Sequence, residues 1–172
     1  MSAGSRCLLG IAQAYLGHAS KGATLIKQGL AEISNMNMKL LAGMFMGFLA
    51  AAQERDGSNS SALETIDQAL GASEDEVFYR PEILRMRGEL RQKLNQQSAA
   101  EADFRAAIQL ANRICAKAWE LRATTSLARL IIEQGRRDEA QKILAPIYNS
   151  FTEGFDTADL KDAKALLDEL SA

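Results

Sequence analysis

The chain has 172 residues, enough for one folded unit to bury about 70% of the surface that the unfolded chain exposes, so no disulfide or metal is needed to stabilise it. Its 47% hydrophobic and 24% charged residues are typical of a globular protein and exclude a disordered or membrane-embedded chain. A net charge of -2 excludes a general attraction to nucleic acid or acidic lipid, and the presence of one histidine excludes most catalytic groups that depend on this residue.

Apolar periodicity, capping residues and turn residues predict an all-α chain of nine helices with no strand. In chain order we expect helices over residues 5–16, 22–35, 38–54, 59–70, 81–95, 98–114, 117–134, 137–150 and 157–170. Ser98 is a predicted N-cap, with Glu101 three residues later. Pro81 suits a first helical turn, whereas Pro146 should bend or break its helix near residues 143–145.

The chain shows no feature of a membrane, metal or cofactor site. Its longest apolar run, residues 40–52, has 13 residues against the roughly twenty needed to cross a bilayer. Cys7 and Cys115 lack the paired spacing of metal ligands or of a disulfide framework, which indicates the cytoplasm. Acidic residues 156, 159 and 162 open the last helix, where they complement the helix dipole rather than a metal. We therefore expect no cofactor, no metal and no enzymatic activity.

A repeat of 38 to 40 residues runs through the chain. Small residues at positions 10, 50, 88 and 128 are each followed twelve positions later by another small residue and, four residues after that, by a large apolar one. Twelve positions is a helix-turn-helix offset, and a spacing of four keeps side chains on one helical face. The units, at about 5–35, 38–70, 81–115 and 117–150, predict four antiparallel helix pairs, followed by a capping helix over 157–170.

This spacing resembles the tetratricopeptide repeat (TPR). The Leu-small, turn-glycine, Ala, large-apolar and Ala positions of that family are matched by Leu49-Ala50, Gly57, Ala62, Ile66 and Ala69. The period is longer than 34 residues, and Gln13, Gln53, Arg91 and Ile131 replace the aromatic residue of the first helix. The resemblance implies an α-α superhelix that binds a protein or peptide partner on its concave face.

The second half carries a further resemblance. The strings EILRMRGEL, AEADFRAAIQLA, KAWELRATTSLARL and QGRRDEAQKILAPIY are similar to the C-terminal helical-repeat region of large bacterial proteins in which a class III nucleotide cyclase precedes a STAND-type ATPase. That resemblance implies a regulatory or scaffold module in signalling, without the cyclase chemistry. The chain would then be a detached tail of such a protein.

The repeat register projects particular side chains onto the concave groove. The expected partner-binding residues are Tyr15, Met44, Arg85, Glu89, Lys93, Arg122, Arg129 and Glu133, and the projection also turns Cys7 and Ala14 inward. Arg122 and Arg129, seven residues apart on one face, would grip an acidic segment or a peptide carboxylate. The alternative is that they pair within the chain with Glu89 and Glu133.

The charges are unevenly distributed. Residues 80–142 hold 13 basic and 8 acidic side chains, whereas the segments on either side are net acidic. This basic band leaves a nucleic-acid-binding helical repeat as an alternative function, although aromatic residues for base stacking are not interleaved with it.

The opening helices are apolar and rich in methionine, whereas a terminal repeat normally needs a polar outer face. We therefore expect the N-terminal end to pack against a preceding repeat, a missing domain or a second copy of the chain as a homodimer. Taken together, the sequence predicts a non-catalytic protein-interaction or regulatory module, with the nucleic-acid binder as the alternative.

Overall fold

The computed structural model describes residues 2–35, 41–72 and 78–171, and every element of regular structure in these ranges is a helix. The helices are α1 (Ala3–Tyr15), α2 (Ala19–Asn35), α3 (Ala42–Arg55), α4 (Asn59–Ala72), α5 (Arg80–Lys93), α6 (Gln97–Arg113), α7 (Lys117–Glu133), α8 (Arg137–Asn149) and α9 (Ala158–Ser171). The predicted all-α fold is thus confirmed. Helix ends agree with the predicted ones to within three residues, except at the predicted start of the third helix, which lies outside the described residues.

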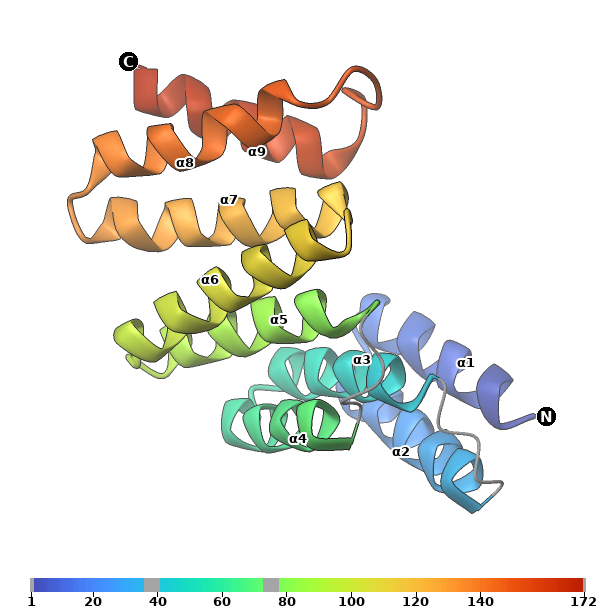
Figure 1. The fold of residues 1–172 in the computed structure, drawn as a ribbon. Helices are drawn as coiled ribbons and strands as arrows, with labels where there is room; N and C mark the ends of the chain where they lie inside the picture. The colour runs from blue at the N-terminus through green and yellow to red at the C-terminus, as the bar shows by residue number, and fades with distance from the viewer. Residues whose placement is uncertain (1, 36–40, 73–77, 172) are drawn as a thin grey trace.

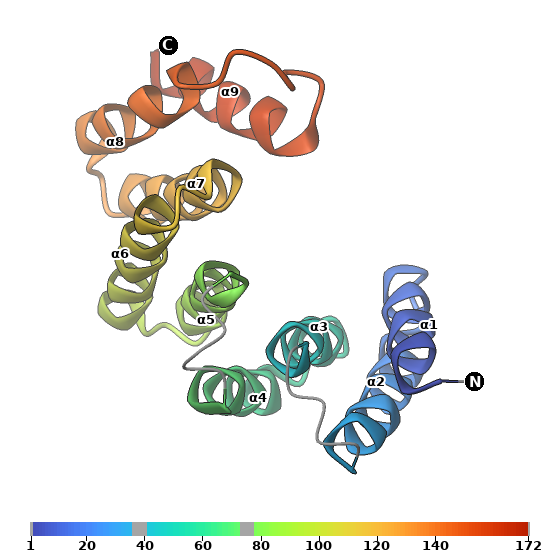
Figure 2. The same cartoon turned by 45° about the vertical axis from the view of Figure 1, so that its right-hand side comes forward.

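Consecutive helices pack as antiparallel pairs, and the pairs stack into a curved array (Figure 1). Each odd-numbered helix also contacts the next odd-numbered one, from α1 to α9. Turning the molecule shows that these odd-numbered helices lie along the inner side of the curve, while α2, α4, α6 and α8 lie along the outer side (Figure 2). None of the described helices combines the length and apolarity that a membrane span requires.

The repeat positions form the packed interior. The large apolar residue of each unit is fully buried, at Ile26, Ile66, Phe104 and Leu144. The small residues lie where paired helices cross, most closely between α1 and α2, where a Cβ atom on Gly10 would stand 2.7 Å from the carbonyl oxygen of Gly22. A helix pair of this kind has little room for side chains at the crossing, so its stability depends on the absence of a Cβ there.

The turns that close the pairs share one backbone feature. The turn residue has a positive φ at Gly17, Gly57, Asn95 and Gly135, a conformation that favours glycine and tolerates asparagine. In each case the residue after it donates a backbone N–H to the carbonyl five residues earlier, as from His18 to Gln13 at 2.9 Å. This bond satisfies a carbonyl that the end of the helix would otherwise leave unpaired.

The predicted N-cap at Ser98 is wrong, and the break that was one of the two outcomes predicted at Pro146 is absent. α6 begins at Gln97 and has no side-chain cap, so Ser98 lies inside the first turn instead of capping it. α8 continues through Pro146 to Asn149 without a break. Leu144 and Ile147, on either side of this proline, are both buried, and their packing holds the helix together despite the lost hydrogen bond.

The last helix closes one end of the stack. α9 packs on α7 and α8 and buries Leu160, Ala163 and Leu166. Its other face carries exposed charged residues, including Lys161, Lys164 and Asp168. A polar outer face of this kind is what a terminal helix of a repeat array needs.

The crossing of α1 and α2 gives a first testable prediction. Gly10→Ala forces a methyl group against the Gly22 backbone, which cannot rotate away as a side chain could, so we expect the free energy of unfolding to fall by about 1–3 kcal/mol. Gly4→Ala is the control, because a Cβ there meets no atom within 4 Å, and it should leave stability unchanged or raise it by about 0.5–1 kcal/mol. Urea denaturation followed by circular dichroism measures both; equal effects would contradict the close crossing.

Candidate functional site

The inner side of the curve contains a groove of about 610 Å³, which we call the central groove. It lies between α1, α3, α5 and α7 and is lined by Tyr15, Phe48, Ala51, Glu54, Arg55, Tyr79, Glu82, Arg85, Met86, Glu89, Lys93, Trp119 and Arg122. A smaller hollow of about 100 Å³ shares Arg85, Glu89 and Arg122 with it and continues toward Asp159 and Asp162 on α9. The two hollows therefore adjoin on the inner surface, where both apolar and charged side chains line them.

Aromatic rings form one side of the central groove. Tyr79 stands edge-on to Trp119, with ring centroids 5.5 Å apart, and Phe48 follows at 6.1 Å from Tyr79. Phe78, which is 73% exposed, meets Trp119 from the other side at 6.5 Å. Edge-to-face contacts of this kind hold the rings in place while leaving part of each ring open to a ligand.

Two arginines stack on rings in the groove. The Arg55 guanidinium carbon lies 4.4 Å from the centre of the Tyr15 ring, and that of Arg122 lies 5.5 Å from the centre of the Trp119 ring. Stacking uses the flat face of a guanidinium and leaves its in-plane N–H groups free to donate. Among the described residues, Arg55 has no acidic partner.

The floor of the groove is tied together by one carboxylate. The side chain of Glu82 is only 4% exposed and accepts two hydrogen bonds from Arg85, at 2.9 and 2.8 Å, while Arg122 of α7 reaches the same carboxylate at 2.8 Å. Arg85 also pairs with Glu89, whose carboxylate accepts a bond from Ser126 of α7 at 3.1 Å. These contacts fix α5 against α7 at the groove.

The groove also shifts the pKa of two of its side chains. Burial, together with the charge of Glu82, raises the pKa of the Tyr79 hydroxyl to about 12, so this tyrosine stays neutral at physiological pH. Burial by itself would lower the pKa of Arg85, but its hydrogen bonds and charge interactions with Glu82 and Glu89 raise it above its ordinary value. Arg85 is therefore a permanent cation already matched by acids.

Five of the eight predicted binding residues line the central groove: Tyr15, Arg85, Glu89, Lys93 and Arg122. Arg129 lies in the adjacent hollow, where it pairs with Asp162 at 2.5 Å. Met44 instead packs, half-buried, against the core between α1, α2 and α3, and Glu133 accepts a hydrogen bond from Gln92 of α5 at 2.8 Å. Neither of these two lines the groove.

The prediction that Cys7 and Ala14 face the concave groove is wrong. Both are buried, at 0% and 5% exposure, because α1 turns this face toward the glycines of α2. The aromatic side of the groove was not predicted from the sequence. A signal for it exists, because Tyr79 and Trp119 are 40 residues apart and so occupy the same repeat position.

The arginines of the basic band are largely paired within the chain. Asp103, 5% exposed, accepts hydrogen bonds from both Arg87 and Arg91, each at 2.7 Å. Arg105 and Arg136 share Glu101 and Glu139 between α6 and α8, and both arginines lower the pKa of Glu101 through hydrogen bonds. These ion pairs neutralise the positive charge that contacts with phosphate groups would need.

The fold is similar to that of solved TPR-like arrays. Two crystal structures of the nearly identical TPR-like repeats of a kinesin light chain-like protein from Podosopora anserina, one of them a variant with a single substitution, match with TM-scores of 0.75 and 0.76. Each match covers 96% of this chain and 83% of the other, at 15% sequence identity. The likeness confirms the predicted TPR-like superhelix. No family model matches the chain, and no curated protein matches it.

The contacts of Glu82 predict that its loss destabilises the fold. Glu82→Ala removes the shared acid and leaves the charges of Arg85 and Arg122 without it, so we expect a loss of about 3–5 kcal/mol in the free energy of unfolding. Asp168→Ala breaks an exposed pair with Lys164 and should cost no more than about 1 kcal/mol. Both losses are read from urea denaturation of the full chain, and comparable values would show that Glu82 does not hold the groove.

Proposed function

We propose that this chain is a non-catalytic scaffold module that binds a peptide segment of a partner protein in its central groove. The observation that carries the proposal is the pairing of an open aromatic surface with stacked arginines along the inner side of a TPR-like superhelix. Extended concave faces are how such repeat arrays bind their partners. Aromatic residues and arginine are also the side chains that contribute most at protein interfaces.

The charges of the groove favour an acidic peptide. Lys93 is already paired with Glu54, and Arg85 with Glu82 and Glu89. Arg55 is the exception, since its contact is the ring of Tyr15, which leaves its N–H groups available to a carboxylate. The preferred segment therefore carries an acidic residue next to an apolar side chain that contacts the ring of Trp119.

A role in signalling follows from the resemblance of residues 80–170 to the C-terminal helical-repeat region of bacterial cyclase and STAND ATPase proteins. That resemblance supports a regulatory module of the bacterial cytoplasm, which recruits a partner rather than catalysing a reaction. The nucleic-acid alternative finds less support, because Arg87, Arg91 and Arg105 of the basic band are matched by Asp67, Asp103 and Glu101.

Peptide binding is tested with a panel of fluorescent 12-residue peptides that vary in charge and apolar content. We expect acidic peptides with an aromatic residue to bind, and Arg55→Glu or Trp119→Ala to weaken them at least about tenfold, a change of roughly 1.4 kcal/mol. Arg113→Glu makes the same charge change outside the groove, on an exposed position of α6, and should have no effect.

Equal losses with Arg55→Glu and Arg113→Glu would contradict the groove assignment. Binding of duplex DNA that falls steeply between 50 and 200 mM salt would instead favour the nucleic-acid alternative, because phosphate contacts release counterions.

We also propose that the chain forms a homodimer through α1. Leu9 and Leu16, seven residues apart on one face, are 41% and 72% exposed, and Leu8 beside them is 60% exposed. The opposite end of the array is closed by α9 with its charged outer face, so the two ends are not equivalent. A second copy of α1 supplies an apolar surface of the same kind, as a two-fold interface requires.

Sedimentation velocity tests the dimer. We expect the unmodified chain to sediment as a dimer at high concentration and Leu9→Glu plus Leu16→Glu to sediment as a monomer, because the introduced carboxylates would be buried without partners. Phe155→Glu changes an apolar residue of similar exposure in the connection before α9 and should leave the dimer intact. A monomer at every concentration would exclude the proposal.

A further inference from the structure

The four helix pairs, α1–α2 to α7–α8, meet at three successive boundaries. Equivalent repeat positions lie at each boundary, but they hold residues of different chemistry. In the middle boundary the positions hold Asp67, Arg87, Arg91 and Asp103, which form one ion-pair cluster. In the last boundary they hold Arg105, Leu127, Ile131 and Ile143, of which Leu127 and Ile131 are fully buried. In the first boundary they hold Lys27, Leu49, Gln53 and Thr65.

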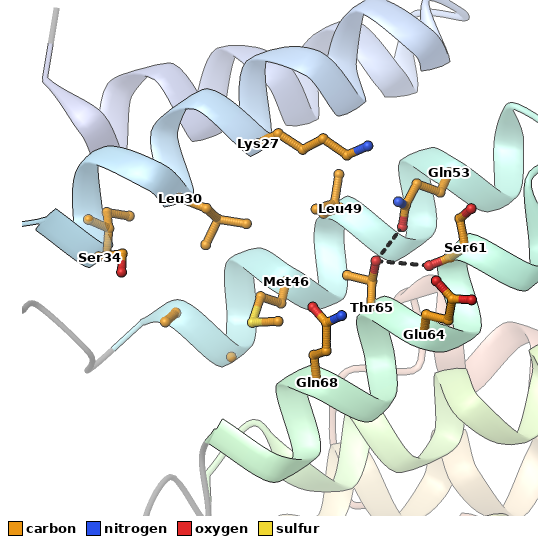
Figure 3. A pocket seen from close by; sticks show the side chains of 13 residues that line it. Lys27, Leu30, Ser34, Met46, Leu49, Gln53, Ser61, Glu64, Thr65 and Gln68 are labelled. Atoms are coloured by element: carbon orange, nitrogen blue, oxygen red, sulfur yellow. Dashed lines mark hydrogen bonds between the residues drawn. The ribbon is translucent and has the colours of Figure 1, made fainter.

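The first boundary encloses a hollow of about 700 Å³ on the outer side of the array, which we call the outer hollow. One face of α3 forms its floor, and α2 and α4 form its two walls (Figure 3). This volume lies within the 300–1,000 Å³ that is usual for small-molecule sites. A stable protein interface would need about 800 Å² from each partner, which is more than a hollow of this size supplies.

The outer hollow has an apolar end and a polar end. Because α2 and α4 both run antiparallel to α3, Leu30 lies near Met46 at one end, while Lys27 and Thr65 lie near Gln53 at the other (Figure 3). Ile33, one turn beyond Leu30 on α2, also lines the hollow. The arrangement suits an amphiphile, with its hydrocarbon part against Leu30, Ile33 and Met46 and its polar head beside Gln53.

Gln53 is the buried polar group that points to a ligand. The residue is 7% exposed, and the only hydrogen bond of its side chain among the described residues is with the hydroxyl of Thr65, at 2.8 Å. That hydroxyl also lies 2.9 Å from the carbonyl oxygen of Ser61. One end of the Gln53 amide is therefore used by Thr65, while the other end faces the outer hollow without a partner (Figure 3). The amide nitrogen at this end is accessible to water, and an acceptor oxygen of a bound polar head can take the place of that water.

The charge at the polar end of the outer hollow favours an amphiphile with an anionic head group. Lys27 has no acidic partner among the described residues, whereas the matching cation of the last boundary, Arg105, is paired with Glu101 and Glu139. Glu64 of α4 also lines the outer hollow, and it too has no ion pair among the described residues. An anionic head beside Lys27 is attracted by the ammonium and opposed by the carboxylate of Glu64, so the two residues should change its binding in opposite directions.

We propose that the outer hollow binds a small carboxylate amphiphile of the fatty-acid type. The carboxylate lies at Lys27 and the unpaired end of the Gln53 amide, and the alkyl chain lies along Leu30, Ile33 and Met46. This site is separate from the central groove and does not depend on the peptide-binding function proposed above.

The test titrates decanoate into the full chain labelled with 13C at the methionine methyl groups. We expect saturable shifts at Met46, which lines the outer hollow, and none at Met86, which lines the central groove. Lys27→Gln should weaken decanoate about two- to fivefold, in line with a solvent-accessible charge pair, and Glu64→Gln should strengthen it about twofold. Arg105→Gln is the matched control and should leave the affinity unchanged.

Comparison with 1-decanol separates recognition of the carboxylate from apolar binding alone. We expect 1-decanol to bind less tightly than decanoate and to be insensitive to Lys27→Gln and Glu64→Gln. The proposal is overturned if Met46 does not shift, if Met86 shifts equally, or if the two substitutions change the affinity for decanoate in the same direction. It is equally overturned if decanol and decanoate bind alike.

Discussion

The close crossing of paired helices at small residues is the constraint on which the rest of this structure depends. Gly10 faces the Gly22 backbone, and Ala128 and Ala140 are buried at the equivalent positions of the last pair. Because the helices approach so closely, the large apolar residue four positions on can fill the space beside the crossing, and one pair can stack on the next. The curve of the array, and with it the central groove, follows from this repeated geometry.

The repeat does not fix the residue type at every position. The residues at the variable positions give each boundary between helix pairs a different chemistry. Arg91 and Asp103 join α5 to α6 by an ion pair, whereas Ile131 and Ile143 occupy the same positions with apolar side chains in the last boundary. The first boundary places a neutral hydrogen bond, between Gln53 and Thr65, beside a hollow whose lysine has no acidic partner among the described residues. Equivalent repeat positions thus form an ion-pair cluster at the middle boundary, apolar packing at the last boundary and a candidate ligand site at the first.

Ion pairs stiffen the floor of the central groove, whereas its mouth is open to a ligand. Glu82 holds Arg85 and Arg122 in place, and the guanidinium of Arg122 lies over the ring of Trp119, which stands beside Tyr79. Rings and arginines that are held in place before binding lose little conformational freedom when a peptide arrives. The charged residues predicted to bind a partner are for the most part already paired within the chain, Arg85 with Glu89 and Glu82, Arg122 with Glu82, and Arg129 with Asp162.

The helix boundaries, the buried repeat positions and the turn residues could all be predicted from the sequence, because each depends on local spacing and on the small number of backbone conformations open to glycine and proline. The burial of Cys7, the aromatic side of the groove and the pairing of Arg122 with Glu82 could not, since they depend on how far each helix is rotated about its own axis. That rotation is decided by all the contacts of a helix with its neighbours at once. The sequence by itself therefore determined that four helix pairs stack on a fixed stride, and only the tertiary structure decided which charges meet and which surfaces stay open.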